Sequence, residues 1–115
     1  MTATNGRAMK AKGSQWERDV VKVLRNAGHQ FVERAYGAGR HDDRGDIDGL
    51  PGFVIEAKNC GRIELGPWMD EAVREASHGA CIPVVVIKRR NRAATDGFVV
   101  MRLSDWAELV RDGDA

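Results

Sequence analysis

The feature that most constrains the fold is the segment of residues 81–88, CIPVVVIK, which contains the longest unbroken apolar run of the chain. A run of β-branched residues of this length is typical of a strand that is buried on both faces. Such a strand needs packed layers on both sides of its sheet, which favours an α/β fold. The run has seven apolar residues, whereas a membrane-spanning helix needs about 20.

Three segments with apolar residues at helical spacing predict helices. They cover residues 15–27, residues 66–79 and residues 104–113. Ser14 and Glu17 have the spacing of a capping box at the start of the first helix, and Pro67 suits the first turn of the second. Residues 1–13 are small, polar and basic. We therefore expect a flexible basic arm over residues 1–13, followed by a single domain over residues 14–115.

Strand patterns lie between these helices. They cover residues 30–35, 46–50, 52–59, 81–88 and 98–103. The second and third strands form a hairpin that turns at Leu50, Pro51 and Gly52. The order of elements is α-β-β-β-α-β-β-α, which predicts a mixed central sheet flanked by helices, with an added C-terminal strand and helix.

The net charge of +1 conceals an asymmetry between the two parts of the chain. Residues 1–45 hold nine Lys and Arg against five Asp and Glu, whereas residues 46–115 hold nine against twelve. Two basic segments are candidates for contacts with phosphate groups, the alternative being a solvated surface. They contain Arg40, His41 and Arg44 in the loop of residues 36–45, and Lys88, Arg89, Arg90 and Arg92 after the fourth strand.

The cysteines and the N-terminus favour a reduced, cytoplasmic protein. The chain has two cysteines without close spacing, which is neither a disulfide framework nor a zinc motif. A zinc site formed by Cys60, Cys81 and His78 stays open as an alternative. Residues 1–13 contain no apolar core of a secretory signal.

The hairpin carries the candidate chemistry. Strand alternation places Val54, Glu56 and Lys58 on one face and the apolar side chains of Phe53, Ile55 and Ala57 on the other. A three-residue turn puts Asp46 opposite Glu56 and Asp48 opposite Val54. A two-residue turn would instead turn both aspartates toward the hydrophobic side, so the apolar pattern favours the first register.

Two carboxylates in such proximity repel each other unless a cation lies between them. Hard oxygen ligands suit Mg²⁺, and Mn²⁺ as well. Lys58 would lie beside the ion, where it could orient or deprotonate an attacking water and offset charge on a phosphoryl transition state. Glu17 lies beside the apolar stripe of the first helix and is a candidate for a third acidic group. Asp42, Asp43 and Asp48 compete with Asp46 for the role of hairpin ligand.

These residues resemble the PD-(D/E)xK nuclease superfamily, whose signature is an Asp at the head of a hairpin followed by Glu-x-Lys on the next strand. The likeness is greatest to archaeal-type and phage Holliday junction resolvases, which open with a Lys-Gly-Ser…Glu-Arg helix. Here the three parts are residues 12–18 (KGSQWER), residues 45–48 (GDID) and residues 55–59 (IEAKN). The chain lacks the proline before Asp46, which the superfamily often lacks too.

The resemblance implies a restriction-endonuclease-like core, with Asp46 and Glu56 as metal ligands, Lys58 as catalytic lysine and Glu17 as the helix carboxylate. It implies a Mg²⁺-dependent endonuclease that cuts four-way or other branched DNA. Because resolution of a four-way junction requires two symmetric cuts, it also implies a homodimer. The alternatives are a repair or restriction-like nuclease of the same superfamily and a non-catalytic DNA-binding protein of the same fold.

Overall fold

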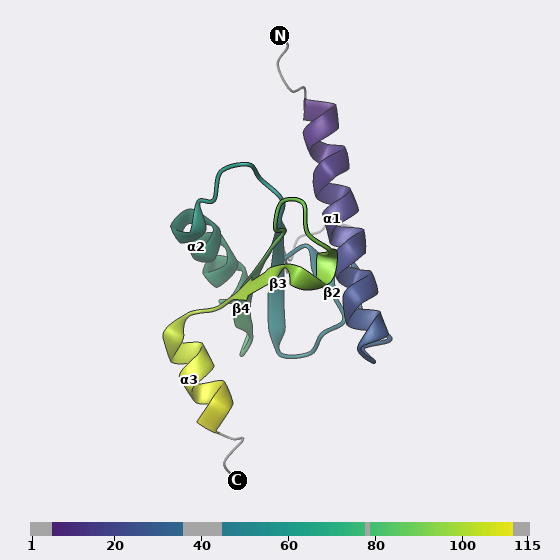
Figure 1. The fold of residues 1–115 in the computed structure, drawn as a ribbon. Helices are drawn as coiled ribbons and strands as arrows, with labels where there is room; N and C mark the ends of the chain where they lie inside the picture. Colours follow the sequence, from purple (N-terminus) through teal and green to yellow (C-terminus); the bar gives the residue numbers. More distant parts are fainter. Residues whose placement is uncertain (1–5, 36–44, 78, 112–115) are drawn as a thin grey trace.

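The computed structural model describes residues 6–35, 45–77 and 79–111, which form three helices and a five-stranded mixed sheet (Figure 1). The helices are α1 (Gly6–Asn26), α2 (Leu65–Ala76) and α3 (Leu103–Arg111), with a short 3₁₀ helix η1 at Ala94–Asp96. The strands are β1 (Glu33–Arg34), β2 (Ile47–Asp48), β3 (Phe53–Lys58), β4 (Ile82–Ile87) and β5 (Phe98–Val100). They follow one another across the sheet in chain order, and only β3 and β4 are parallel neighbours. The predicted α/β class and the restriction-endonuclease-like order of elements are confirmed.

The sheet is covered on both faces around β3 and β4, as the apolar run of β4 predicts. On one face, Ile55 and Val84 pack with Trp16 of α1 in the larger core cluster. On the other face, Val85 packs with Trp68 of α2 in a second cluster. Figure 1 shows α1 and α2 on opposite sides of the sheet. The central strands are therefore shielded from solvent by a helix on each side.

Pro83 is accommodated within β4 because its backbone nitrogen points toward an unpaired part of the neighbouring position in the sheet. The amide of Ile82 donates to the carbonyl oxygen of Gly52 on the β3 side, so the next nitrogen points toward β5. Pairing between β4 and β5 begins only at Val85. The missing N–H of Pro83 therefore removes no hydrogen bond from the sheet.

The hairpin register is the predicted one. Ile47 lies opposite Ile55, which is the pairing that a three-residue turn requires. Gly49 precedes the turn with a positive φ of 93°. A Cβ atom at this position would lie 2.1 Å from the carbonyl oxygen of Phe31. Only glycine therefore allows the hairpin to pack this closely against the segment before β1.

Several predicted boundaries are wrong. Helix α1 begins at Gly6 rather than residue 15, because the Ala, Met and Lys residues before Ser14 are good helix formers. Residues 6–13 therefore extend α1 and are not a flexible arm, and Ser14 lies inside the helix rather than at a capping box. The predicted strand over residues 30–35 is reduced to β1, since its partner β2 has only two residues.

The C-terminal elements also differ from the prediction. Strand β5 ends at Val100 and α3 begins at Leu103, before Ser104. The carbonyl oxygen of Arg102 accepts from the amides of Asp105 and Trp106, and the Arg102 side chain pairs with Asp105. These contacts start the helix at the point where the sequence favoured continuation of the strand. Among the described residues, none of the helices has the length and apolar character needed to span a bilayer.

Candidate active site

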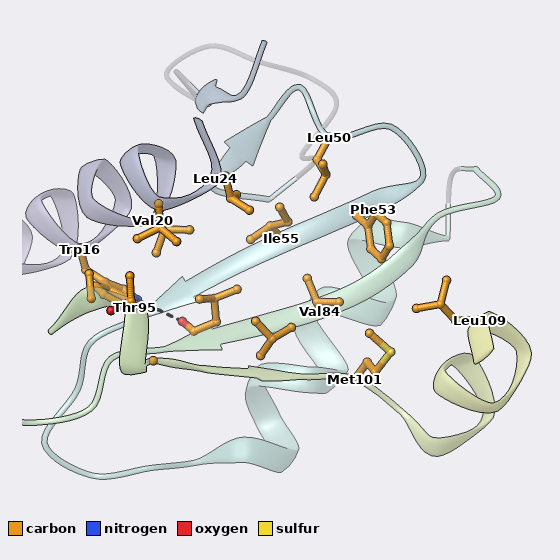
Figure 2. A pocket seen from close by; sticks show the side chains of 15 residues that line it. Trp16, Val20, Leu24, Leu50, Phe53, Ile55, Val84, Thr95, Met101 and Leu109 are labelled. Atoms are coloured by element: carbon orange, nitrogen blue, oxygen red, sulfur yellow. Dashed lines mark hydrogen bonds between the residues drawn. The ribbon is translucent and has the colours of Figure 1, made fainter. Parts of the chain in front are cut away.

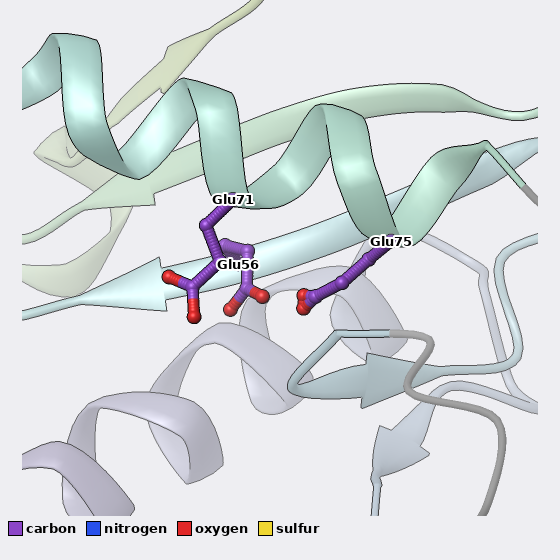
Figure 3. A group of neighbouring side chains, drawn as sticks. All are labelled: Glu56, Glu71 and Glu75. Carbon is purple, nitrogen blue, oxygen red and sulfur yellow. The ribbon is translucent and has the colours of Figure 1, made fainter.

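A buried carboxylate lies at the centre of the molecule, on the face of β3 that packs against α2. Glu56 is only 3% exposed, and its neighbour in β4 is Val85. Two carboxylates of α2, Glu71 and Glu75, point toward it (Figure 3). One carboxylate oxygen from each of the three residues lies within 4.8 Å of the other two. The strand face that carries the Glu-x-Lys motif is thus enclosed by a helix that supplies further acidic groups.

Asp46 joins this group from the head of the hairpin. Its amide donates to the carbonyl oxygen of Ile55 at 2.8 Å, and its Oδ2 accepts from the amide of Ala57 at 2.9 Å. The side chain therefore replaces a backbone acceptor in the ladder beside β3. Because these bonds hold Asp46 next to β3, its carboxyl lies in hydrogen-bond contact with that of Glu56. We refer to Asp46, Glu56, Glu71 and Glu75 as the carboxylate cluster.

Gly45 allows this approach of Asp46 to β3. It has a φ of 89° and forms a bridge to Ile55. A Cβ atom on Gly45 would lie 2.6 Å from the carbonyl oxygen of Ile55. Real Cβ atoms do not approach an oxygen so closely, so a larger residue would push the Asp46 backbone away from β3.

The carboxylate cluster has too much negative charge for a buried site. Burial, and then hydrogen bonds with Glu75 and Asp46, raise the pKa of Glu56 to about 11. Glu56 therefore holds a proton at neutral pH when no cation is present. A divalent ion would displace that proton and offset the remaining charge. The donor set consists of hard carboxylate oxygens, which fits Mg²⁺ or Mn²⁺ and does not favour softer metals.

Lys58 lies beside the cluster and is held in place by two groups of α2. Its Nζ is 3.2 Å from Oε1 of Glu71 and 5.9 Å from the ring centroid of Trp68. Burial alone would lower the pKa of Lys58, but the hydrogen bond to Glu71 and the charges of the cluster raise it above its ordinary value. Lys58 is therefore a protonated ammonium at neutral pH, which can donate hydrogen bonds and offset negative charge.

Glu17 of α1 approaches the same site from the other side. It forms an ion pair with Arg34 of β1, with an oxygen–nitrogen distance of 3.1 Å. Burial and the charge of Asp46 raise the pKa of Glu17, in spite of this partner. The side chain thus points toward the sheet, and it lies close enough to Asp46 for their charges to interact.

The structure brings Glu17, Asp46, Glu56 and Lys58 together, and it favours Asp46 over Asp48. Asp48 lies opposite Glu33, and it is not among the carboxylates that shift the pKa of Glu56. The other candidates from the loop lie outside the described residues. These are Arg40, His41, Asp42, Asp43 and Arg44.

The alternative zinc site is contradicted by the topology. Cys60 follows the C-terminal end of β3, whereas Cys81 precedes the N-terminal end of β4. Because these strands are parallel, the two cysteines lie at opposite ends of the sheet and both are free thiols. The third member of that set, His78, lies outside the described residues.

Sequence reasoning missed the two carboxylates of α2. Glu71 and Glu75 are four residues apart and flank the buried positions Ala72 and Ala76. Like charges at this spacing destabilise a helix, and an acidic pair beside the buried stripe indicates that something positive lies opposite. That signal was present in the sequence, but only the packing of α2 on β3 shows which strand the pair faces.

The basic residues after β4 form a tight turn, residues 89–92, which we call the arginine turn. The Nζ atom of Lys88 donates to the carbonyl oxygens of Arg89 and Arg92, and it lies 5.7 Å from the ring centroid of Trp16. Lys88 therefore stabilises the conformation of the arginine turn through these two hydrogen bonds. Arg89 stacks on Phe98, Arg92 pairs with Asp96, and the side chain of Arg90 is exposed.

Comparison with known proteins identifies the family of the chain. Residues 8–113 match a family model described as "Phage putative PDDEXK endonuclease". None of the curated proteins compared with the chain gives a significant match. The matched span includes Glu17, the hairpin, the Glu-x-Lys strand and α2, which contribute to the candidate site. DNA is the substrate that such a nuclease implies, and divalent metals are its typical cofactors. The chain therefore belongs to this family of PDDEXK endonucleases within the PD-(D/E)xK superfamily.

Proposed function

We propose that the protein is a divalent-metal-dependent endonuclease that cuts branched DNA, as Holliday junction resolvases do. The observation that carries the nuclease assignment is the convergence of Asp46, Glu56 and Lys58 on one face of the sheet. Asp46 and Glu56 are the proposed metal ligands. Glu17, at the edge of the site, and Glu75, in contact with Glu56, would complete the acidic shell.

Each side chain has a distinct proposed role in phosphodiester hydrolysis. Asp46 and Glu56 would hold a divalent ion, which would supply Lewis-acid polarisation of the scissile phosphate. The Lys58 ammonium donates hydrogen bonds to the attacking water and to a phosphate oxygen, and offsets charge that develops on the phosphate. As the water oxygen bonds to phosphorus and the phosphodiester P–O bond breaks, an ionised carboxylate of the cluster would accept the proton of the water, and the leaving oxygen would take a proton from solvent. Glu71 orients Lys58 through their 3.2 Å contact. The raised pKa of Lys58 favours this role of charged donor over that of a general base.

The preference for branched DNA rests on the ordered resemblance to resolvases and on the prospect of a twofold dimer. An apolar groove of about 340 Å³ lies between α1 and the sheet and reaches Leu109 of α3 (Figure 2). Helix α3 exposes Leu103, Trp106, Leu109 and Val110, and none of its nine residues is buried. An isolated helix of this length is marginal in water. We propose that a second copy of the chain covers α3 and the groove.

A cleavage assay on synthetic DNA tests the proposed activity. We expect paired cuts near the branch point of a four-way junction with Mg²⁺ or Mn²⁺, and none with EDTA. Glu56→Gln should abolish cleavage, and Lys58→Ala should reduce it about 100- to 1,000-fold, as loss of a charge-stabilising donor does. Lys22→Ala and Asp70→Asn, which change exposed charges of α1 and α2, should cut like wild type.

The outcomes separate the alternatives. Equal cutting of linear duplex would support a repair or restriction-like nuclease and contradict the junction preference. Salt-sensitive binding of DNA without cleavage in Mg²⁺ or Mn²⁺ would instead indicate a non-catalytic DNA-binding protein. Full activity of Lys58→Ala would contradict the proposed site itself.

A further inference from the structure

A second cavity, about 340 Å³ in volume, opens beside the candidate active site at the C-terminal ends of β3 and β4. Its apolar walls are Ile63, Ile87 and Phe98, and its charged walls are Arg89, Arg90 and Arg92 of the arginine turn. We call it the arginine pocket. Ligand pockets usually have volumes of about 300–1,000 Å³, so the space is large enough for a small polar ligand or one nucleotide unit.

The register of the sheet places the arginine pocket on the same face as Lys58. Lys58 lies beside Ile87 in β4, and Ile87 lies opposite Phe98 in β5. Residues paired across neighbouring strands project to the same face, and neighbouring strands are about 4.8 Å apart. Phe98 is therefore two strands, or roughly 10 Å, from the proposed catalytic lysine. The pocket therefore lies beside the proposed position of the scissile phosphate and not at it.

The chemistry of the pocket combines an aromatic surface with positive charge. The guanidinium carbon of Arg89 lies 4.7 Å from the ring centroid of Phe98, and 49% of Phe98 is exposed. Arg92 pairs with Asp96, which offsets one of the three guanidinium charges. The remaining charge favours an anionic ligand, while the ring and the stacked guanidinium form a flat surface for a planar group.

From this arrangement we infer that the arginine pocket binds an unpaired nucleotide of the DNA strand, next to the phosphate at Lys58. The inference rests on the proposed nuclease function, because it takes DNA as the ligand. A phosphate alone would leave the walls formed by Ile63 and Phe98 unused. A base-paired duplex keeps its base faces stacked, so only an unpaired base can lie against the aromatic surface. The branch point and the frayed strand ends of DNA supply such bases.

Equilibrium binding with the full chain tests the pocket without cleavage. Fluorescence anisotropy in EDTA would compare a labelled oligothymidylate with a blunt duplex of equal length. Phe98→Ala should weaken binding of the single strand by about 5- to 150-fold and leave binding of the duplex within about twofold. Phe98→Tyr, which keeps the ring, should bind like wild type. Phe31→Ala, which removes another exposed aromatic ring, is the matched control and should change neither affinity.

An abasic strand gives a second, independent readout. It should bind the wild-type protein about as weakly as the intact strand binds Phe98→Ala. The inference is overturned if Phe98→Ala leaves single-strand binding unchanged, or if it weakens single strand and duplex equally. The cleavage assay separates the two proposals. Active enzyme without a Phe98 effect contradicts the pocket alone, whereas a selective Phe98 effect without any cleavage contradicts the nuclease alone.

Discussion

At the scale of single residues, the burial of Glu56 conflicts with the ionised state that a metal ligand needs. Its side chain is almost fully buried among other carboxylates, where an ionised group is costly. Protonation relieves that cost in the metal-free protein, and a bound divalent ion would relieve it instead. A cluster of this kind therefore decreases the stability of the metal-free fold, and it also provides oxygen ligands for a cation.

The raised pKa of Glu56 makes metal-free stability depend on pH. Folded Glu56 keeps its proton up to about pH 11, whereas an unfolded Glu releases it near 4.5. The folded state binds more protons in this window, so the free energy of unfolding should fall as pH rises. For one proton the slope is at most about 1.4 kcal/mol per pH unit. Urea titrations in EDTA between about pH 6 and 9 would measure it.

Glu56→Gln provides the control for this pH dependence. It should flatten the profile, since glutamine does not titrate. Mg²⁺ should raise the midpoint of thermal unfolding of the wild type at neutral pH, because the ion binds the folded state. A wild-type profile as flat as that of the variant would contradict the assignment of the proton to Glu56.

Glu75 should contribute to cation binding, although the sequence motif does not include it. Its carboxyl is hydrogen-bonded to that of Glu56. We expect Glu75→Gln to weaken Mn²⁺ binding roughly 10- to 100-fold, as loss of supporting groups at metal sites does. Isothermal titration calorimetry would measure it, with Asp70→Asn on the exposed side of α2 as control. Equal affinities of the two variants would show that Glu75 has no part in the site.

At the scale of elements, the hairpin determines where Asp46 lies. Gly45 and Gly52 both have positive φ values, of 89° and 86°. Only Gly45 has backbone atoms where a Cβ would be, whereas the space beside Gly52 is open. Substitutions at the two glycines therefore form a matched pair. A Cβ at Gly52 adds backbone strain alone, whereas a Cβ at Gly45 also displaces the Asp46 backbone from β3.

Gly52→Ala should cost about 1–2 kcal/mol of unfolding free energy, through the left-handed conformation alone. Gly45→Ala should cost roughly 3 kcal/mol and should also remove cleavage activity, since Asp46 would move away from Glu56. Chemical denaturation and the cleavage assay check both. Wild-type activity in a folded Gly45→Ala protein would contradict the proposed placement of Asp46.

At the scale of the whole molecule, α3 and the apolar groove predict self-association. Analytical ultracentrifugation should give a mass twice that of the chain. Trp106, 52% exposed on α3, is the most suitable test position because buried tryptophans dominate many interfaces. Trp106→Ser should raise the dimer dissociation constant roughly 30-fold or more. Glu108→Gln on the same helix should leave it unchanged, and a monomeric wild type would contradict the dimer.

The placement of the hairpin side chains could be predicted from the sequence because it depends only on neighbouring residues. Strand alternation has a period of two residues, and the length of the turn sets the register, so Glu56, Lys58 and Asp46 could be placed on one face. The apolar run of β4 likewise required layers on both sides of the sheet. These inferences need only neighbouring residues and the burial of apolar side chains.

Tertiary packing decided what local rules could not. The shortness of β1 depends on its partner β2, which has only two residues, and the sequence does not specify this locally. Glu71 and Glu75 entered the site only because α2 packs across the face of β3 that carries Glu56. The sequence by itself thus determined the motif and its register. The enclosure that raises the pKa of Glu56, and the position of the arginine pocket beside Lys58, result from contacts between segments distant in the chain.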